Sequence, residues 1–125
     1  MREETQKWIS QADKDLGTAG FALNSVDGPL PVTTGLHCQT SAEYYLKAYL
    51  QENNIVFSSG LSLNALFGSC VSADTSFETL RKDIRQLEGY SIASRYPKVR
   101  DSLEFRKNAI AAVTRVKDFV MDKLA

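Results

Sequence analysis

The stretch CQTSAEYYLKAYL, residues 38–50, decides the fold class. Its apolar residues return every three or four positions, which is the spacing of one face of an α-helix. Thr33 or Thr34 can cap this helix at its start, and Asn53-Asn54 is expected to end it. The residues of its apolar face are Cys38, Ala42, Tyr45, Leu46, Tyr49 and Leu50.

The same spacing predicts a helix on each side of this one. A first helix carries apolar residues from Trp8 to Val26 and ends at Asp27-Gly28-Pro29-Leu30-Pro31, where two prolines prevent helix continuation. A last helix begins near Ser102. Its expected buried face consists of Leu103, Ala109, Val113, Val116, Val120 and Leu124.

Two further helices are expected between residues 60 and 90. A short one is apolar at Leu63, Leu66 and Phe67, with Gly68 as its stop. A third long helix opens with the S/T-x-x-E capping box Thr75-Ser76-Phe77-Glu78 and ends at Gly89.

These elements predict an all-α fold, an antiparallel up-and-down four-helix bundle. One short accessory helix lies between its second and third long helices. The 125 residues fit one domain, 1–125, since a chain of this length builds one core.

The amino-acid composition excludes several classes of function. Lys plus Arg and Asp plus Glu number 15 each, so the chain lacks the positive field of a general nucleic-acid coating protein. No apolar run is long enough to span a bilayer, and the start MREET has no signal-peptide pattern, so a cytoplasmic protein is expected. Cys38, Cys70 and His37 cannot supply four metal ligands, so we expect no metal, no cofactor and two buried, reduced cysteines.

The segment Tyr90-Ser91-Ile92-Ala93-Ser94-Arg95-Tyr96-Pro97 is the first candidate for a functional site. It places an arginine between aromatic residues in a predicted linker, followed by the basic residues Lys98 and Arg100. Guanidinium groups hold phosphates and aromatic rings stack on bases. In the structural alternative, Arg95 pairs with a carboxylate such as Glu43 while Tyr90 and Tyr96 cover the end of the bundle.

A second candidate is the polar row Gln39, Glu43 and Lys47, whose members lie four residues apart on the second helix. Such a row is a solvated face with a weak Glu-to-Lys pair, or it lines a ligand or partner surface.

Three stretches together resemble the HEPN (higher eukaryotes and prokaryotes nucleotide-binding) domain family. They are Trp8 with Ala12 and Asp15-Leu16, then Cys38-Gln39-x-Ser41-Ala42-Glu43-x-Tyr45-Leu46-Lys47-Ala48-Tyr49-Leu50, and Tyr90-Ser91-x-x-x-Arg95-Tyr96-Pro97. The resemblance covers nearly the whole chain. It implies a four-helix bundle that forms homodimers, often beside a minimal nucleotidyltransferase partner, and in many members a metal-independent ribonuclease of toxin–antitoxin or defence systems.

The chain departs from the ribonuclease pattern, in which an arginine is followed four to six residues later by a histidine. No histidine follows Arg95, and the only one, His37, lies upstream on the second helix. Tyr44 also stands where the family commonly has lysine, and Gly60-Leu61-Ser62-Leu63 keeps only the leucine of a Thr-His-Asp-Leu pattern.

The leading hypothesis is therefore a non-catalytic, dimeric binding module for a nucleotidyltransferase, a nucleotide or RNA. The alternative is a divergent metal-independent ribonuclease that uses Arg95 with Tyr90, Tyr96 or His37, and a third is a purely structural dimerisation module. Candidates for a dimer interface are Leu36, Phe105, Ile110 and Phe119.

Overall fold

The computed structural model describes residues 1–23, 32–95 and 103–125, and it describes side chains over 1–21, 34–89 and 104–125. Within these ranges the chain forms helices and no strand. The helices are α1 (Glu3–Leu23), α2 (Val32–Glu52), α3 (Leu63–Ala73), the 3-10 helix η1 (Thr75–Leu80), α4 (Arg81–Arg95) and α5 (Leu103–Leu124).

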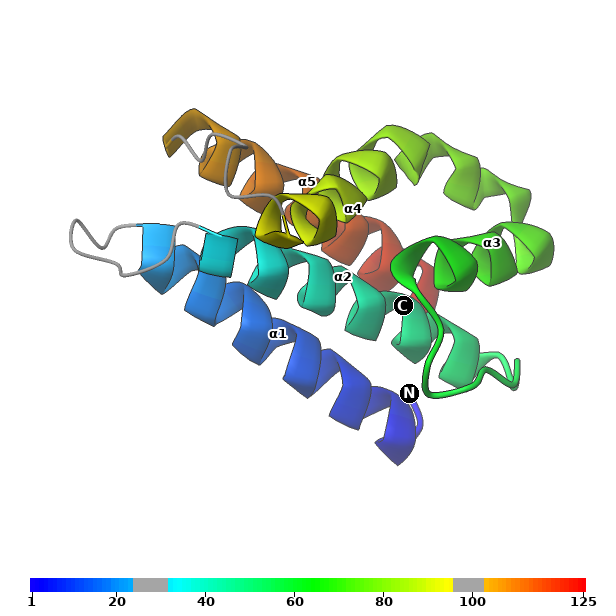
Figure 1. Cartoon of the computed structure of the whole chain (residues 1–125). Helices are drawn as coiled ribbons and strands as arrows, with labels where there is room; N and C mark the ends of the chain where they lie inside the picture. The colour runs from blue at the N-terminus through cyan, green and yellow to red at the C-terminus, as the bar shows by residue number, and fades with distance from the viewer. Residues whose placement is uncertain (24–31, 96–102) are drawn as a thin grey trace.

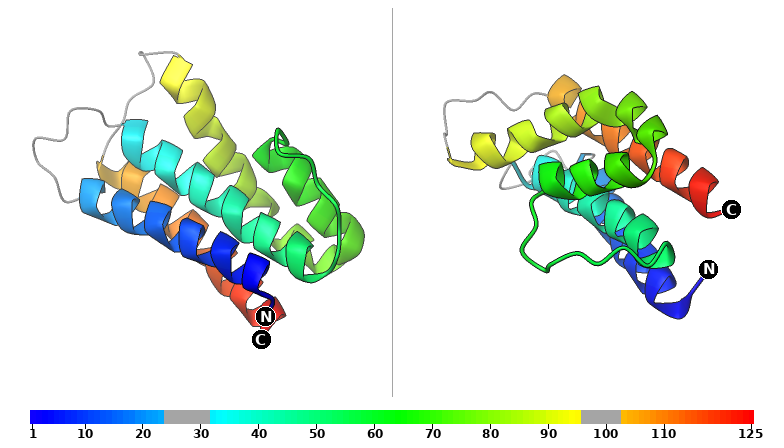
Figure 2. Two further views of the ribbon diagram at one scale, coloured as in Figure 1. Left: turned by 90° about the horizontal axis from the view of Figure 1, so that it is seen from below. Right: turned by 90° about the vertical axis from the view of Figure 1, so that its right-hand side faces the viewer.

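Four long helices alternate in direction, and the shorter α3 lies beside one end of the bundle (Figure 1). Helix α2 is the central element, because it packs against α1, α3, α4 and α5. The predicted all-α bundle with an accessory helix between the second and third long helices is confirmed. Figure 2 shows that the C-terminal end of α4 lies at the same end of the bundle as the N-terminal ends of α2 and α5.

The core is one continuous cluster to which α1, α2, α3, η1, α4 and α5 all contribute. Most of the residues predicted for the apolar faces are fully buried, which follows from the match between their spacing and the 3.6-residue turn. The largest side chains that are less than 2% exposed include Tyr45, Phe67, Phe77, Leu46, Val113 and Val116.

Helices α1 and α2 meet through small residues. Ala12, Ala19, Ser41 and Ala42 are fully buried, and the Ser41 hydroxyl donates a hydrogen bond of 2.8 Å to the Ala12 carbonyl. Small side chains allow two helix backbones to approach closely, and the hydrogen bond satisfies the Ser41 hydroxyl that this contact buries.

Several predicted helix boundaries are wrong. Gly68 lies inside α3 and Gly89 lies inside α4, so neither glycine ends its helix. Because α4 continues to Arg95, residues 90–95 are helical rather than part of a linker, whereas residues 96–102 lie outside the described ranges. Val26 is likewise outside them. Thr33 and Thr34 are not caps, since α2 already begins at Val32.

The predicted capping box at Thr75 is also wrong. Asp74 is the N-cap, and its carboxylate accepts a hydrogen bond of 3.0 Å from the Ser76 backbone N–H. The chain first makes the 3-10 helix η1 and then enters α4 at Arg81. Lys123 of α5 lies 2.8 Å from the Asp74 carboxylate, and these hydrogen bonds lower the Asp74 pKa to about 2. The aspartate thereby links the start of η1 to the last turn of α5.

No helix in the described part of the chain combines the length and the apolar character needed to cross a bilayer.

Candidate functional site

The polar row of α2, formed by Gln39, Glu43 and Lys47, is not a fully solvated face. Gln39 and Glu43 are half-buried, and Lys47 is only 9% exposed. The Gln39 side-chain amide donates to the Glu43 carboxylate at the long distance of 3.5 Å. The interpretation of this row as an ordinary solvated face is therefore wrong at Lys47, since a lysine is rarely buried to this extent.

Lys47 is held by aromatic rings. Its ammonium lies 5.1 Å from the centre of the Trp8 ring and 5.3 Å from that of Tyr44. The two rings stack on each other with centres 5.5 Å apart, and Phe57 meets Trp8 edge-on at 6.0 Å. The negative faces of the rings attract the cation, and this attraction strengthens when water is partly excluded.

This aromatic cluster, Trp8, Tyr44, Lys47 and Phe57, was not predicted from the sequence. Tyr44 occupies the position where the family commonly has a lysine, and the replacement exchanges a second positive charge for a ring that supports Trp8 and Lys47. The sequence does contain one indication of this cluster. Tyr44 and Lys47 are three residues apart on α2 and so share one side of that helix.

Glu43 is the other unusual group in this row. Burial raises the pKa of its carboxyl, while the hydrogen bond from Gln39 and the charge of Lys47 act in the opposite direction. A half-buried carboxylate that is costly to ionise occurs more often at binding sites than on an inert helix surface.

We expect Glu43→Gln to stabilise the protein at neutral pH. Because the folded state raises the Glu43 pKa, the ionised carboxylate opposes folding above that pKa, and the penalty disappears as the carboxyl becomes protonated at lower pH. The stability difference between the variant and the original chain should therefore be positive at pH 7 and shrink on acidification. Urea denaturation at several pH values measures it. Glu88→Gln on α4 is the control, and a destabilised Glu43→Gln at pH 7 would contradict the prediction.

His37 is turned toward α1. Its Nδ1 atom lies 3.1 Å from the Asp15 carboxylate, with both side chains partly buried. The histidine therefore has a structural partner that joins α1 and α2.

Residues 90–95, the described part of the basic segment, form the C-terminal end of α4, away from the aromatic cluster (Figure 1). Tyr90 and Arg95 belong to the last turns of α4, and their side chains lie outside the described ranges, as do Tyr96, Lys98 and Arg100 entirely. The C-terminal end of α4 lies at the end of the bundle where α2 begins (Figure 1). Tyr44 and Lys47 of the aromatic cluster belong instead to the C-terminal half of α2.

The residues predicted for a dimer interface have different surroundings. Phe105, Ile110 and Phe119 pack partly against the core, and the Phe119 ring contacts Phe77 at 4.8 Å. Leu36 is 39% exposed on α2 and is the member of this group most open to a partner.

Both cysteines are buried and free, as expected. Burial raises the pKa of each thiol to about 12, so the reactive thiolate form is suppressed. No cluster of three or more histidine, cysteine, aspartate or glutamate side chains suited to a metal ion occurs among the described residues.

The described helices form an all-α four-helix bundle. A family model described as HEPN domain matches residues 5–124, nearly the whole chain. The chain therefore belongs to the HEPN domain family. Comparisons with curated proteins and with solved structures found no match.

Proposed function

We propose that this HEPN chain is a non-catalytic, dimeric binding module that acts in the cytoplasm. Its ligand is a nucleotide, RNA or a nucleotidyltransferase partner, and its contact surface is centred on Arg95 and Tyr96. One observation carries the proposal: the chain has a single histidine, His37, which is paired with Asp15, and no histidine follows Arg95.

The chemistry of the basic segment favours binding over cleavage. A guanidinium can hold a phosphate through two parallel hydrogen bonds. Metal-independent cleavage also needs a group that exchanges protons near neutral pH, which an imidazole provides. Tyr90 and Tyr96 are poor replacements, since the pKa of tyrosine is ordinarily about 10.

The local excess of positive charge also supports the segment around Arg95 as a contact surface. Lys98, Arg100, Arg106 and Lys107 follow Arg95 in the sequence and are opposed only by Asp101 and Glu104. In a chain of zero net charge, such a local excess attracts phosphates without making the whole molecule a nucleic-acid coat. The polar row Gln39, Glu43 and Lys47 is proposed as its extension along α2, and the burial and raised pKa of Glu43 support that role.

The test separates binding from cleavage. The purified protein is titrated with nucleotides and short RNA, incubated with tRNA and mRNA, and tested for co-purification with a nucleotidyltransferase encoded beside it. We expect at least one of these interactions and intact RNA, with a sedimenting species of twice the 13.9 kDa chain mass.

Two results would contradict the proposal. RNA cleavage that disappears in Arg95→Ala would identify a divergent ribonuclease instead. A monomer without any of the three interactions would exclude both the dimer and the binding function.

A further inference from the structure

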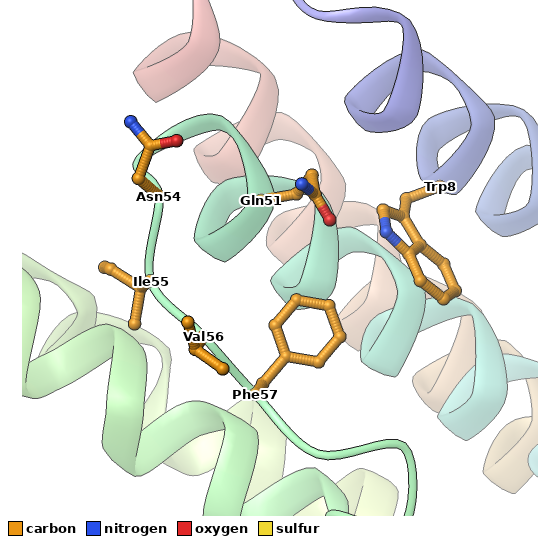
Figure 3. Close-up of a pocket in the computed structure, with 6 residues that line it drawn as sticks. All are labelled: Trp8, Gln51, Asn54, Ile55, Val56 and Phe57. Carbon is orange, nitrogen blue, oxygen red and sulfur yellow. The ribbon is translucent and has the colours of Figure 1, made fainter.

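A hollow of about 430 Å³ opens beside the turn that ends α2. Figure 3 shows Gln51 at its upper edge, Trp8 on one side and the chain from Asn54 to Phe57 on the other. A second hollow of about 390 Å³ adjoins the first, because Trp8 and Gln51 line both. The two hollows therefore offer adjoining places for a ligand that contacts Trp8.

The turn that ends α2 builds one wall of the first hollow. Asn54 adopts the left-handed conformation with a φ of 58°, and the Ile55 N–H donates a hydrogen bond of 2.9 Å to the Leu50 carbonyl. This arrangement closes the helix and sends the chain away from it. Ile55 and Phe57 are partly buried, whereas Val56 between them is 96% exposed.

The opposite wall is an aromatic ring that is held in place before any ligand arrives. Trp8 stacks on Tyr44, contacts Phe57 edge-on and carries the Lys47 ammonium. The Trp8 side chain is nevertheless partly exposed. A ring fixed by three neighbours loses little freedom when a ligand packs on it, which favours binding.

The two aromatic rings of the first hollow do not form parallel walls. The centres of Trp8 and Phe57 are 6.0 Å apart, and their planes cross at 62°. A flat ring held between two others needs parallel planes about 7 Å apart, twice an ordinary contact of about 3.5 Å. The hollow therefore suits a ring that packs on one aromatic face only. Polarised C–H groups are attracted to such a face, because aromatic faces carry partial negative charge.

Two carboxamides supply the polar groups of the first hollow. The Asn54 carbonyl oxygen accepts a hydrogen bond from the Arg2 guanidinium, which leaves the Asn54 NH2 group available to donate. The Gln51 carboxamide makes no hydrogen bond to another described residue, so it can both donate and accept. Among the described residues, no charged side chain lines this hollow. These groups match a neutral ligand whose own groups donate and accept, as hydroxyls do.

The second hollow is richer in hydrogen-bonding side chains. Besides Trp8 and Gln51 it is lined by Glu4, Lys7 and Gln11. A carboxylate accepts hydrogen bonds, an ammonium donates them and an amide does both, so this hollow also suits hydroxyl groups. The charges of Glu4 and Lys7 offset each other, which again favours a ligand without net charge.

We propose that the two hollows bind a neutral oligosaccharide, one sugar ring of which packs its C–H face on Trp8 while Gln51 and Asn54 hydrogen-bond its hydroxyls. An aliphatic protein side chain fits less well, because it leaves both amides unpaired when they are desolvated. A cationic ligand fits less well too, since the Lys47 ammonium already lies 5.1 Å from the Trp8 ring centre and repels it.

The chain contains one tryptophan, so its fluorescence reports directly on the hollows. The purified protein is titrated with glucose, maltotriose and cellotriose, and with sorbitol, adenosine and N-acetyl-leucinamide for comparison. We expect a saturable change with at least one trisaccharide, at an affinity about tenfold or more above that of glucose, because only the longer sugar reaches both hollows. The affinity should change little with salt. Sorbitol has hydroxyls but no ring, so it should give no saturable change.

Matched variants locate the binding. Gln51→Leu keeps the side-chain size and removes the amide, so it should weaken trisaccharide binding about tenfold. Gln51→Glu keeps the shape, removes the donor and should also weaken it. Gln11→Ala changes only the second hollow and should weaken trisaccharide binding about threefold. Gln86→Leu on α4 is the control and should have no effect, and circular dichroism checks the helicity of every variant.

Saturation-transfer NMR on the bound trisaccharide tests the packing of the sugar ring. The strongest transfer from the protein's aromatic protons is expected at ring C–H protons of the sugar that share one face. Equal transfer to all sugar protons would contradict packing on Trp8.

The proposal is overturned if neither trisaccharide changes the Trp8 fluorescence saturably, or if both Gln51 variants bind like the original chain. It is also overturned if adenosine or N-acetyl-leucinamide binds more tightly than both trisaccharides. The proposed Arg95 function fails separately, so Arg95→Ala should leave sugar binding intact, whatever it does to the binding of RNA. The two sites lie apart, since Gln39 and Gln51 are 12 residues apart on α2, roughly 18 Å along a helix.

Discussion

Replacing Phe77 by alanine is expected to lower the free energy of unfolding by about 3–5 kcal/mol and the midpoint temperature by roughly 10–20 °C. Phe77 has no exposed surface, and its ring contacts Tyr49 of α2 at 4.6 Å and Phe119 of α5 at 4.8 Å. The ring therefore joins η1 to two long helices. Its removal leaves a cavity. Because η1 is held between α3 and α4, it can move to fill this cavity only in part.

Urea denaturation followed by circular dichroism measures this loss. The control is Phe21→Ala, because Phe21 is 81% exposed on α1 and should change stability by no more than about 0.5 kcal/mol. A loss below about 1 kcal/mol at Phe77 would show that the ring does not join these helices.

The helices themselves were predictable because their apolar faces are regular. Cys38, Ala42, Tyr45 and Leu46 return at helical spacing on α2, and all four are fully buried. Val113, Val116 and Val120 do the same on α5. Such a pattern is a direct consequence of burying one side of a helix with 3.6 residues per turn, so sequence alone reveals it.

The helix ends were less predictable, because a glycine in the sequence does not by itself end a helix. A glycine ends a helix where the chain needs the left-handed conformation, and no glycine among the described residues adopts it. Asn54 takes that role at the end of α2. Gly68 and Gly89 instead remain inside helices, at a cost of about 1 kcal/mol each relative to alanine, which tertiary packing offsets.

The aromatic cluster shows a second limit of sequence reasoning. Trp8 and Lys47 lie on different helices, and only the register between α1 and α2 brings the ammonium over the ring. A four-residue polar repeat cannot reveal that its lysine is buried by a neighbouring helix. The row Gln39, Glu43 and Lys47 was found from its spacing, whereas the burial that makes it unusual depends on tertiary packing.

The proposed binding surface predicts that Arg95→Ala weakens RNA binding by roughly ten- to a hundredfold, the range expected for losing hydrogen bonds to a charged group. The slope of log affinity against log salt concentration should also fall by about 1, since one phosphate contact disappears. Fluorescence anisotropy with a labelled short RNA at several salt concentrations measures both quantities.

Two matched variants distinguish the loss of a specific phosphate contact from a simple loss of positive charge. Arg85→Ala removes the same charge from an exposed position of the same helix, so an equal loss in both variants would mean that only net charge matters. Arg95→Lys keeps the charge but lacks the planar fork, and an intermediate affinity is expected if the guanidinium grips a phosphate. Circular dichroism tests whether Arg95 is needed for the fold instead of for binding. If Arg95→Ala loses helicity, the guanidinium supports the bundle by pairing with a carboxylate such as Glu43, and the contact surface must be sought elsewhere on the molecule.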